Sequence, residues 1–198
     1  MIKEKIKALI QREIEAIEAI PVDGVIEQAL ELIYRQVHQK KGKVVLSGMG
    51  KAGQIGVNIA TTLSSTGTPA IFMHPSEAQH GDLGVVQEND VLLLLSNSGK
   101  TREILELETL VKRLHPQIKI IGLTGNPDGE MTRTCNVVLC TGNPKEICPL
   151  GLTPTTSTTV MTVVGDLLVV LLMEKINFSK ESYALRHHSG YLGTKART

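Results

Sequence analysis

The sequence predicts an α/β fold: a three-layer α-β-α sandwich with a five-stranded parallel sheet and N-terminal helices. Short apolar runs recur along the chain with helical stretches between them, which is typical of right-handed crossovers between parallel strands. The runs are continuously apolar rather than alternating with polar residues, which indicates a sheet covered on both faces. The chain has 198 residues, of which 41% are apolar, and this is enough for one domain with its own core.

The N-terminal segment predicts two amphipathic helices ahead of the first strand. Between residues 2 and 20, isoleucine and leucine recur at steps of three and four, which places them on one helical face. Pro21 ends this helix, and Asp23 is placed to cap a second helix that runs to about Gln39. Their apolar stripes suit a subunit interface. The expected organisation is a single domain, with a helical extension at 1–40 and the α/β core and C-terminal tail at 41–198.

Five strands and three connecting helices follow from the apolar pattern. The strands are expected at Val44–Leu46, Ala70–Met73, Val91–Leu95, Ile118–Leu123 and Val137–Leu139. The helices are expected at Ala52–Ser65, at Thr101–Leu114 and, as a short turn, at Gly129–Thr134. Ligands of such sheets bind at the carboxyl ends of the strands, near the point where the strand order reverses. Chemistry is therefore expected in the loops that follow strands.

The most apolar stretch, Val160–Met173, imitates a membrane span. It has fourteen residues, whereas a helix that crosses a bilayer needs about 20. Asp166 lies near its middle, where a charge is costly in lipid. We therefore expect a buried core helix and no membrane partner.

Composition excludes several classes of function. The net charge of +1 leaves no strongly basic or acidic tail, and the absence of Trp leaves few stacking faces, so no nucleic-acid partner is expected. Cys135, Cys140 and Cys148 form no C-x-x-C pair, so no metal site is expected. Charged residues at positions 3–5 interrupt any apolar leader, and the expected location is the cytoplasm.

The loop Ser47–Gly53 after the first strand reads G-x-G-x-x-G, which is the dinucleotide-binding pattern. That pattern requires an acidic residue after the second strand, where this chain has His74, and Lys51 is foreign to it. We therefore expect no cofactor. The loop remains a glycine turn at a helix N-terminus, which suits an anion. Its candidate ligands are Ser47, Gly48 and Gly50.

A second candidate anion site, Ser96–Thr101, follows the third strand. Its G-K-T ending is like a nucleotide-binding Walker loop, but that motif requires a glycine where Leu94 stands. Hydroxyl groups beside the free amides of a helix N-terminus suit one phosphate monoester. The alternative is an ordinary serine-capped helix start. The candidate ligands are Ser96, Asn97, Ser98 and Thr101.

Two titratable residues lie in loops after the second and fifth strands. His80 lies between Glu77 and Gly84, where a histidine titrates near neutrality. Glu146 lies in a loop bounded by prolines and glycines, where it is either a catalytic carboxylate or simply solvated. Each residue taken alone has an ordinary structural explanation.

The last third of the chain adds hydroxyls and histidines. A cluster at Thr153–Thr159 starts the long apolar helix and offers Thr155 and Ser157 as further candidate phosphate ligands. In the tail, His187 and His188 are adjacent and lack the spacing of a metal site. The alternative for this segment is a solvated tail.

A series of motifs over residues 40–195 resembles the sugar isomerase (SIS) domain family and, within it, the arabinose-5-phosphate isomerases. They are G-M-G-K-A-G, S-T-G-T-P, H-P-S-E-A-x-H-G-D-L-G, S-N-S-G, K-E-x-C-P-L-G-L-x-P-T-x-S-T-T and L-x-H-x-x-G-x-L-G. The resemblance implies a flavodoxin-like SIS fold that commonly assembles as a tetramer. Many relatives continue into paired CBS modules, and that regulation is not expected here.

The resemblance also implies an activity and a set of residues. Family members interconvert D-arabinose 5-phosphate and D-ribulose 5-phosphate through an enediolate and supply 3-deoxy-D-manno-octulosonate synthesis for lipopolysaccharide or capsule. The chain departs from the family at Gly99-Lys100-Thr101, where many relatives read G-E-S, and at the larger side chains of positions 188, 189 and 191. The catalytic positions that carry over are Lys51, His80, Glu103, Glu146 and His187.

Isomerisation needs a base, an electrophile at the carbonyl oxygen and a phosphate anchor. We assign Glu146 as base and Lys51 as electrophile, with Glu103 orienting Lys51 or a histidine. His187 or His80 is expected to handle ring opening or the hydroxyl proton. The alternatives are a 6-phospho-3-hexuloisomerase and a non-catalytic SIS sensor of sugar phosphates. Expected partners are a sugar-phosphate substrate, an inhibitory downstream sugar acid or its nucleotide-activated form, and three further copies in a homotetramer.

Overall fold

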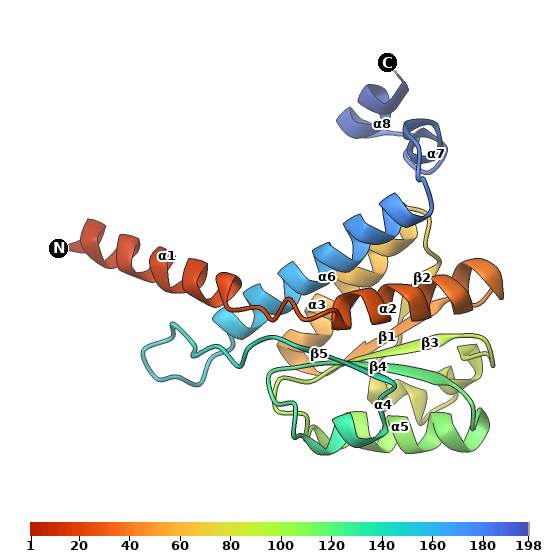
Figure 1. The fold of residues 1–198 in the computed structure, drawn as a ribbon, viewed down its shortest axis with the longest axis horizontal. Helices are drawn as coiled ribbons and strands as arrows, with labels where there is room; N and C mark the ends of the chain where they lie inside the picture. The colour runs from red at the N-terminus through yellow and green to blue at the C-terminus, as the bar shows by residue number, and fades with distance from the viewer. Residues whose placement is uncertain (198) are drawn as a thin grey trace.

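The computed structural model describes residues 1–197 and contains a five-stranded parallel sheet in the order β2-β1-β3-β4-β5 (Figure 1). The strand order reverses between β1 and β3, as in flavodoxin-like folds. The predicted fold class is therefore confirmed. The strands are β1 Val44–Gly48, β2 Ala70–Phe72, β3 Val91–Leu95, β4 Lys119–Thr124 and β5 Val137–Cys140.

Helices cover both faces of the sheet because successive side chains of each buried strand point to opposite sides. Leu93 and Leu95 of β3 join the core beneath α2, α3 and α6, whereas Leu92 and Leu94 join the core beneath α4 and α5 (Figure 1). Both faces are thus dry, which explains the continuous apolar runs. These helices are α2 Val25–Ile33, α3 Gly50–Ser65, α4 Pro75–Ala78, α5 Arg102–Leu114 and α6 Thr156–Lys175.

Several short elements complete the connections. The second N-terminal helix continues from α2 into a wider π-type turn, η1 Tyr34–Gln39, and so ends where the sequence predicts. The 3-10 turn η3 Glu130–Thr134 also lies where a short turn is predicted. The segment after β2 differs from the expected loop, since it forms α4 and a 3-10 turn, η2 Asp82–Val85.

Helix α6 carries the predicted core residues. Among residues 1–197 it is the helix that is long and apolar enough to cross a membrane, and half of its most apolar window is buried inside the protein. Its inner face, including Val160, Val164 and Leu168, packs in the same core as α3. A Cβ at Gly165 would lie 2.5 Å from the Ile59 side chain, so glycine is needed for this close approach. The prediction of a buried core helix is confirmed.

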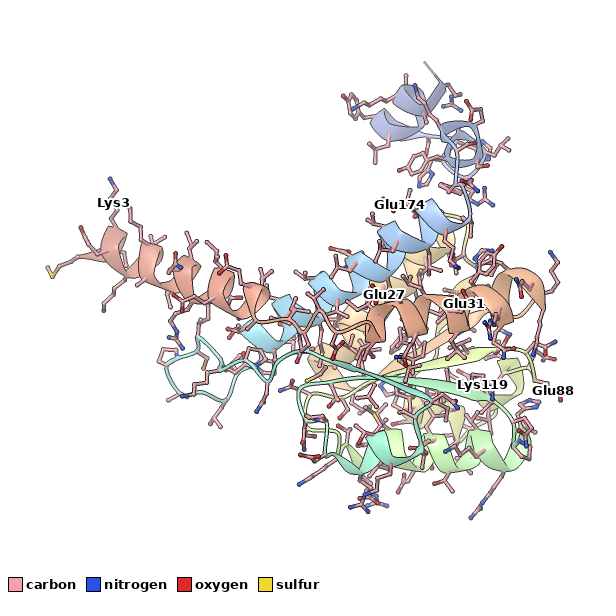
Figure 2. All side chains as sticks on the ribbon, viewed as in Figure 1. Lys3, Glu27, Glu31, Glu88, Lys119 and Glu174 are labelled. Carbon is pink, nitrogen blue, oxygen red and sulfur yellow. The ribbon has the colours of Figure 1, made fainter. Side chains whose placement is uncertain are left out.

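The two ends of the chain stand clear of the sheet. Helix α1, Ile2–Glu18, has no fully buried residue and extends away from the body (Figure 1). Figure 2 shows Lys3 near its free end, apart from the other elements. Its apolar stripe is exposed, with Ile2 at 72% and Ile10 at 54% of their full accessibility. The tail forms α7 Lys180–Ala184 and α8 Gly190–Arg197, which pack against each other beyond the C-terminal end of α6 (Figure 1).

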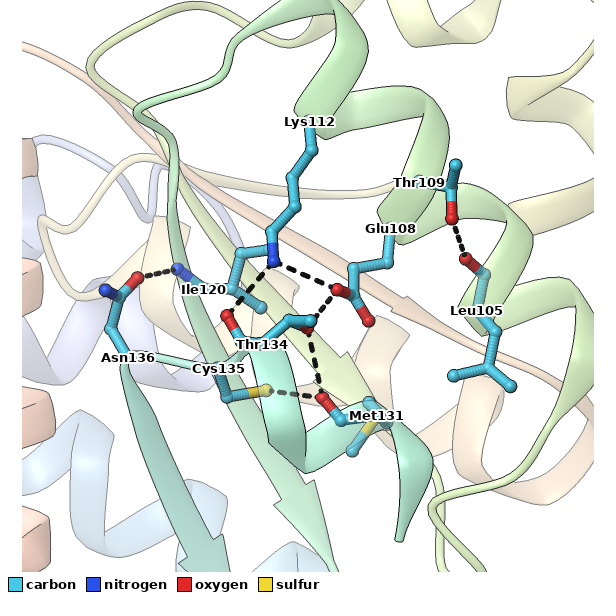
Figure 3. Close-up of polar contacts among 9 residues, drawn as sticks. All are labelled: Leu105, Glu108, Thr109, Lys112, Ile120, Met131, Thr134, Cys135 and Asn136. Carbon is cyan, nitrogen blue, oxygen red and sulfur yellow. Dashed lines mark hydrogen bonds and ion pairs between the residues drawn. The ribbon is translucent and has the colours of Figure 1, made fainter.

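A polar cluster ties α5 to the segment before β5 (Figure 3). Glu108 of α5 is 6% exposed, and its Oε1 accepts hydrogen bonds from Lys112 Nζ at 3.1 Å and from the Thr134 hydroxyl. Lys112 Nζ also donates to the Thr134 carbonyl at 3.2 Å. Nearby, burial raises the pKa of the Cys135 thiol to about 12, which keeps it protonated. This cluster is a structural cross-link.

Candidate active site

A cavity of about 850 Å³ lies at the carboxyl edge of the sheet. The segments after β1, β3 and β5 surround it, together with the N-terminal end of α6 and one residue of α1. Its size is in the range of small-molecule sites, and its position at the strand-order reversal is where α/β sheets bind ligands. The predicted site residues that line it are Lys51, Ser96, Asn97, Ser98, Thr101, Glu146 and Ser157.

The loop after β3 folds into a tight turn that presents hydroxyls and amides. Ser96 Oγ lies 2.7 Å from Thr101 Oγ1 and accepts the amide of Gly99 at 3.2 Å. Gly99 has a φ of 64°, which favours glycine. Thr101 is the N-cap of α5 but makes no side-chain capping bond, so the first amides of α5 stay available. This geometry suits a phosphate group.

The glycine loop after β1 places Lys51 at the cavity. Lys51 is the second residue of α3, is exposed and lines the cavity. A Cβ at Gly53 would lie 2.6 Å from the carbonyl oxygen of Gly48, so the close packing of the helix start on the strand end requires glycine. Gly50, with a φ of 56°, makes the turn between them. The glycines therefore shape the loop that presents Lys51.

Ser47 differs from its predicted role as an anion ligand. It is fully buried at the end of β1, and its hydroxyl donates to the carbonyl of Met73 at 2.7 Å. This bond ties β1 to the segment after β2. Ser47 and Gly48 do not line the cavity. In this conformation they support the loop that does.

Glu146 is held by the N-terminal end of α6. Its Oε2 accepts from the Thr155 amide at 2.7 Å, the Thr155 hydroxyl at 2.9 Å and the Ser157 amide at 3.3 Å, and its Oε1 accepts from the Ser157 hydroxyl. Burial acts to raise the pKa of Glu146, but the hydrogen bonds from Ser157 and Thr155 act the other way and leave the pKa below 4.5. The carboxylate also lies at the positive end of the helix dipole. It is therefore ionised at neutral pH.

This arrangement changes the expectation for the hydroxyl cluster. The sequence predicts that Thr155 and Ser157 bind phosphate, but both use their amides and hydroxyls on Glu146. Glu146 Oε1 accepts one hydrogen bond whereas Oε2 accepts three, and a carboxylate oxygen has two lone pairs. Oε1 is therefore the oxygen with capacity left for a ligand. A phosphate-binding role for Thr155 and Ser157 stays a prediction.

Three predicted catalytic residues are not part of the lining of this cavity. Glu103 is in the first turn of α5, and His80 is exposed in the turn between α4 and η2. His187 follows α7, where its ring stacks on Tyr183 at 3.7 Å and its Nδ1 lies 3.0 Å from the Tyr183 carbonyl oxygen. The cavity and His187 lie at opposite ends of α6, which is about 30 Å long at 1.5 Å per residue. His187 does not reach the cavity of its own chain.

The cavity also contains residues that the sequence did not single out as ligands. Arg12 of α1 lines it and donates to the main-chain oxygen of Glu146 at 3.0 Å. No sequence pattern could identify Arg12, because the two residues are 134 positions apart. Cys148 also lines the cavity, and hydrogen bonds, chiefly from Thr153, lower the pKa of its thiol to about 6. Within residues 1–197, no three His, Cys, Asp or Glu side chains are grouped to hold a metal ion.

The doubly wound sheet and its hydroxyl-lined cavity define an α/β domain of the class that binds small ligands. Residues 37–171 match the SIS domain family. The chain belongs to this family. Within it, the chain is 47% identical over 187 residues to arabinose 5-phosphate isomerase KdsD of Shigella flexneri, and 46% identical to that of Escherichia coli K12. Both matches cover 93% of this chain, which spans 56% of each relative's length.

For two solved structures, the likeness covers nearly the full length of both chains. A Bacteroides fragilis protein, described as a candidate phosphosugar isomerase involved in capsule formation, is 59% identical with a TM-score of 0.95. The match covers 96% of this chain and 100% of that one. An Escherichia coli CFT073 protein solved in complex with arabinose 5-phosphate is 36% identical with a TM-score of 0.84, over 94% of this chain and 97% of that one.

Proposed function

We propose that this chain is an aldose–ketose isomerase that interconverts D-arabinose 5-phosphate and D-ribulose 5-phosphate. The observation that carries the proposal is the cavity, where Lys51, Glu146 and the Ser96–Thr101 loop meet. These are a cation, a carboxylate and a phosphate-sized anchor, the three parts that enediolate chemistry needs. The KdsD relatives and the solved complex with arabinose 5-phosphate support this choice of sugar.

In the proposed mechanism the Ser96–Thr101 loop and the α5 amides anchor the substrate phosphate. Anchoring a remote group holds the reacting carbons in place. In the aldose-to-ketose direction, Glu146 Oε1 takes the proton from C2 and returns it at C1, while Lys51 stabilises the charge that develops on the carbonyl oxygen at C1. The proton of the C2 hydroxyl passes to that oxygen, and His187 or His80 is the proposed carrier of this proton. The proposal requires no metal, so treatment with a chelator should leave activity unchanged. Loss of activity that a divalent ion restores would contradict this.

The proposed assembly is a homotetramer in which the site is shared between copies. Three features support it: the exposed isoleucine stripe of α1, the exposed Leu167 and Val170 on the outer face of α6, and the distance of His187 from its own cavity. We infer that His187 serves the cavity of another copy. Mixing inactive Glu146→Gln and His187→Ala subunits should then restore part of the activity. A monomeric mass at full activity would contradict shared sites.

The cellular role follows from the same proposal. A cytoplasmic enzyme of this kind supplies 3-deoxy-D-manno-octulosonate synthesis, and its product enters lipopolysaccharide or capsule. Lys100 is exposed within the Ser96–Thr101 loop, whereas His188 and Tyr191 lie in the tail. A larger anionic sugar, such as the downstream sugar acid or its nucleotide-activated form, would contact all three only across two copies. Competitive inhibition is expected, and calorimetry without binding at millimolar ligand would exclude it.

One assay separates this proposal from its alternatives. A Methanococcus jannaschii protein described with a 3-hexulose-6-phosphate isomerase function is 18% identical, and the Vibrio vulnificus NanR protein complexed with ManNAc-6P is 20% identical. At these identities the likeness concerns the fold alone. Incubation with arabinose 5-phosphate, hexulose 6-phosphates and glucosamine 6-phosphate should give product from the first. Turnover of a hexulose phosphate alone, or of none, would favour the other isomerase or a sensor.

A further inference from the structure

Hydrogen bonds link helix α1 to one peptide group of the loop that carries Glu146. Arg12 Nη2 donates to the Glu146 carbonyl oxygen at 3.0 Å. Glu13 Oε1 accepts from the Thr156 hydroxyl at 2.8 Å, and the same hydroxyl oxygen accepts the Ile147 amide at 3.1 Å. The Glu146 carbonyl and the Ile147 amide belong to one peptide bond. Adjacent residues of α1 therefore hold both ends of that bond, one directly and one through Thr156.

Holding both ends of a peptide group fixes its plane, because the group is rigid and planar. The plane sets the backbone dihedrals on either side, and these aim the Glu146 side chain. Residues 144–154 contain no helix or strand, so regular backbone hydrogen bonds do not fix that plane. The carboxylate is held from the other side by α6, through Thr155 and Ser157. Glu146 is thus clamped between two helices.

The burial of the contact supports a specific role. Thr156 is 1% exposed, so water has little access to replace the bond from Ile147. Glu13 has its second carboxylate oxygen, Oε2, buried without a hydrogen-bond partner in the described structure. An unpaired buried oxygen costs stability. The position of Glu13 is therefore poorly explained by stability alone.

We propose that Arg12 and Glu13 are positioning residues that orient the Glu146–Ile147 peptide and thereby the carboxylate of Glu146. The proposal rests on the proposed function, because it assumes that Glu146 acts on the substrate. Both residues precede the part of the chain that matches the SIS family, residues 37–171. A helix outside the family core would then set the geometry of a residue inside it.

The test compares Arg12→Ala and Glu13→Ala with Lys7→Ala and Glu15→Ala in the full chain. The controls remove the same charges from exposed positions of the same helix, and alanine keeps the helix. We expect kcat to fall by about 10- to 100-fold in the two test variants, with little change in KM, because a small displacement of a reacting group has effects of this size. The controls should retain wild-type kcat.

Conservative variants sharpen the result. Glu13→Gln keeps an acceptor oxygen for Thr156 and should recover most of the kcat that Glu13→Ala loses. Arg12→Lys keeps a hydrogen-bond donor and should recover part of the kcat that Arg12→Ala loses. An equal loss in Glu13→Gln and Glu13→Ala, or an equal loss in the controls, would overturn the positioning role.

A second measurement does not depend on turnover. Hydrogen exchange of the amides of residues 145–157 should be faster in Arg12→Ala and Glu13→Ala than in wild type, and unchanged in the controls. Unchanged exchange in both test variants overturns the proposal, as does faster exchange with unchanged kcat. If the wild-type chain turns over no arabinose 5-phosphate, the proposed function fails, and the exchange data alone decide whether α1 orders this loop.

Discussion

Glu108 and Glu146 are both shielded carboxylates held by hydroxyl groups, yet their surroundings differ. Glu108 lies in the closed α5 cluster of Figure 3, where the donors include the cation of Lys112. Glu146 lies on the wall of a cavity, and the donors to it are the neutral amides and hydroxyls of Thr155 and Ser157. A carboxylate that pairs with a cation in a closed cluster stabilises the fold. A carboxylate that neutral donors hold at a cavity stays ionised and can still contact a ligand. Glu108 is buried, whereas Glu146 is only partly buried.

The largest expected effect is on the chemistry of Glu146. Glu146→Gln keeps the side-chain volume and removes the basicity, so kcat should fall by about 10²- to 10⁴-fold while KM for arabinose 5-phosphate changes little. Exchange of the C2 hydrogen with deuterated solvent should fall in parallel. Glu108→Gln is the matched control and should retain kcat.

A different result would assign the role of base to His187. If Glu146→Gln still exchanges the C2 hydrogen at the normal rate while His187→Gln does not, then His187 is the base. Glu146 would then orient the substrate or its neighbours. Loss of kcat in Glu108→Gln as large as in Glu146→Gln would break the comparison itself.

The acid side of the pH–rate profile gives the next largest effect. Since the pKa of Glu146 is below 4.5, a Glu146 base stays ionised and kcat should be flat from pH 7 down to about pH 5. Imidazole bases in general give an acid limb near pH 6.5, with about a tenfold loss per unit below it. Steady-state kinetics at half-unit intervals would distinguish the two. A limb near pH 6.5 that disappears in His187→Gln would contradict the assignment.

The third prediction concerns stability rather than rate. Glu108→Ala removes the buried acceptor that Lys112 Nζ and the Thr134 hydroxyl share, and should lower the free energy of unfolding by about 1–3 kcal/mol. Glu106 lies on the same helix in an exposed pair with Arg102, and Glu106→Ala should change the free energy of unfolding much less, because solvent screens an exposed pair. Denaturant titration of both variants measures this difference. Equal costs would show that the Glu108 cluster is no cross-link.

The smallest effect is a pH dependence of stability. The folded pKa of Glu146 is below its ordinary value of 4.5, so the folded chain binds fewer protons than the unfolded chain in that range. The resulting stabilisation is complete above pH 4.5 and is lost as pH falls through the folded pKa. Glu146→Gln should lack this component in denaturant titrations between pH 3 and 6. An identical pH dependence in both proteins would contradict the lowered pKa.

The sequence predicts the sheet and its loops well because both depend on local patterns. Apolar runs mark all five strands, and the glycine and serine loops after β1 and β3 lie at the cavity. The resemblance identifies Glu146, since its own loop pattern fits a solvated carboxylate equally well. The clamp by Thr155 and Ser157 depends on how the loop folds back on α6, which no spacing shows.

Long-range contacts explain what sequence reasoning missed. Arg12 reaches Glu146 only because α1 packs beside the start of α6, and nothing in its helical stripe marks it as a cavity residue. Ser47 has the residue type of an anion ligand, but its strand-end position turns the hydroxyl toward Met73. The length of α6 separates His187 from the cavity of its own chain, and the sequence motif around His187 does not show this distance.

That length has a consequence for mixtures of subunits. One rigid helix separates the two candidate groups of each copy, so in a closed assembly with shared sites one subunit would supply Glu146 to one cavity and His187 to a different one. A copy that carries both substitutions would then disable two cavities rather than one. In randomly mixed assemblies the intact share would fall as the square of the wild-type fraction, so a defective allele would interfere with a normal one beyond simple dilution.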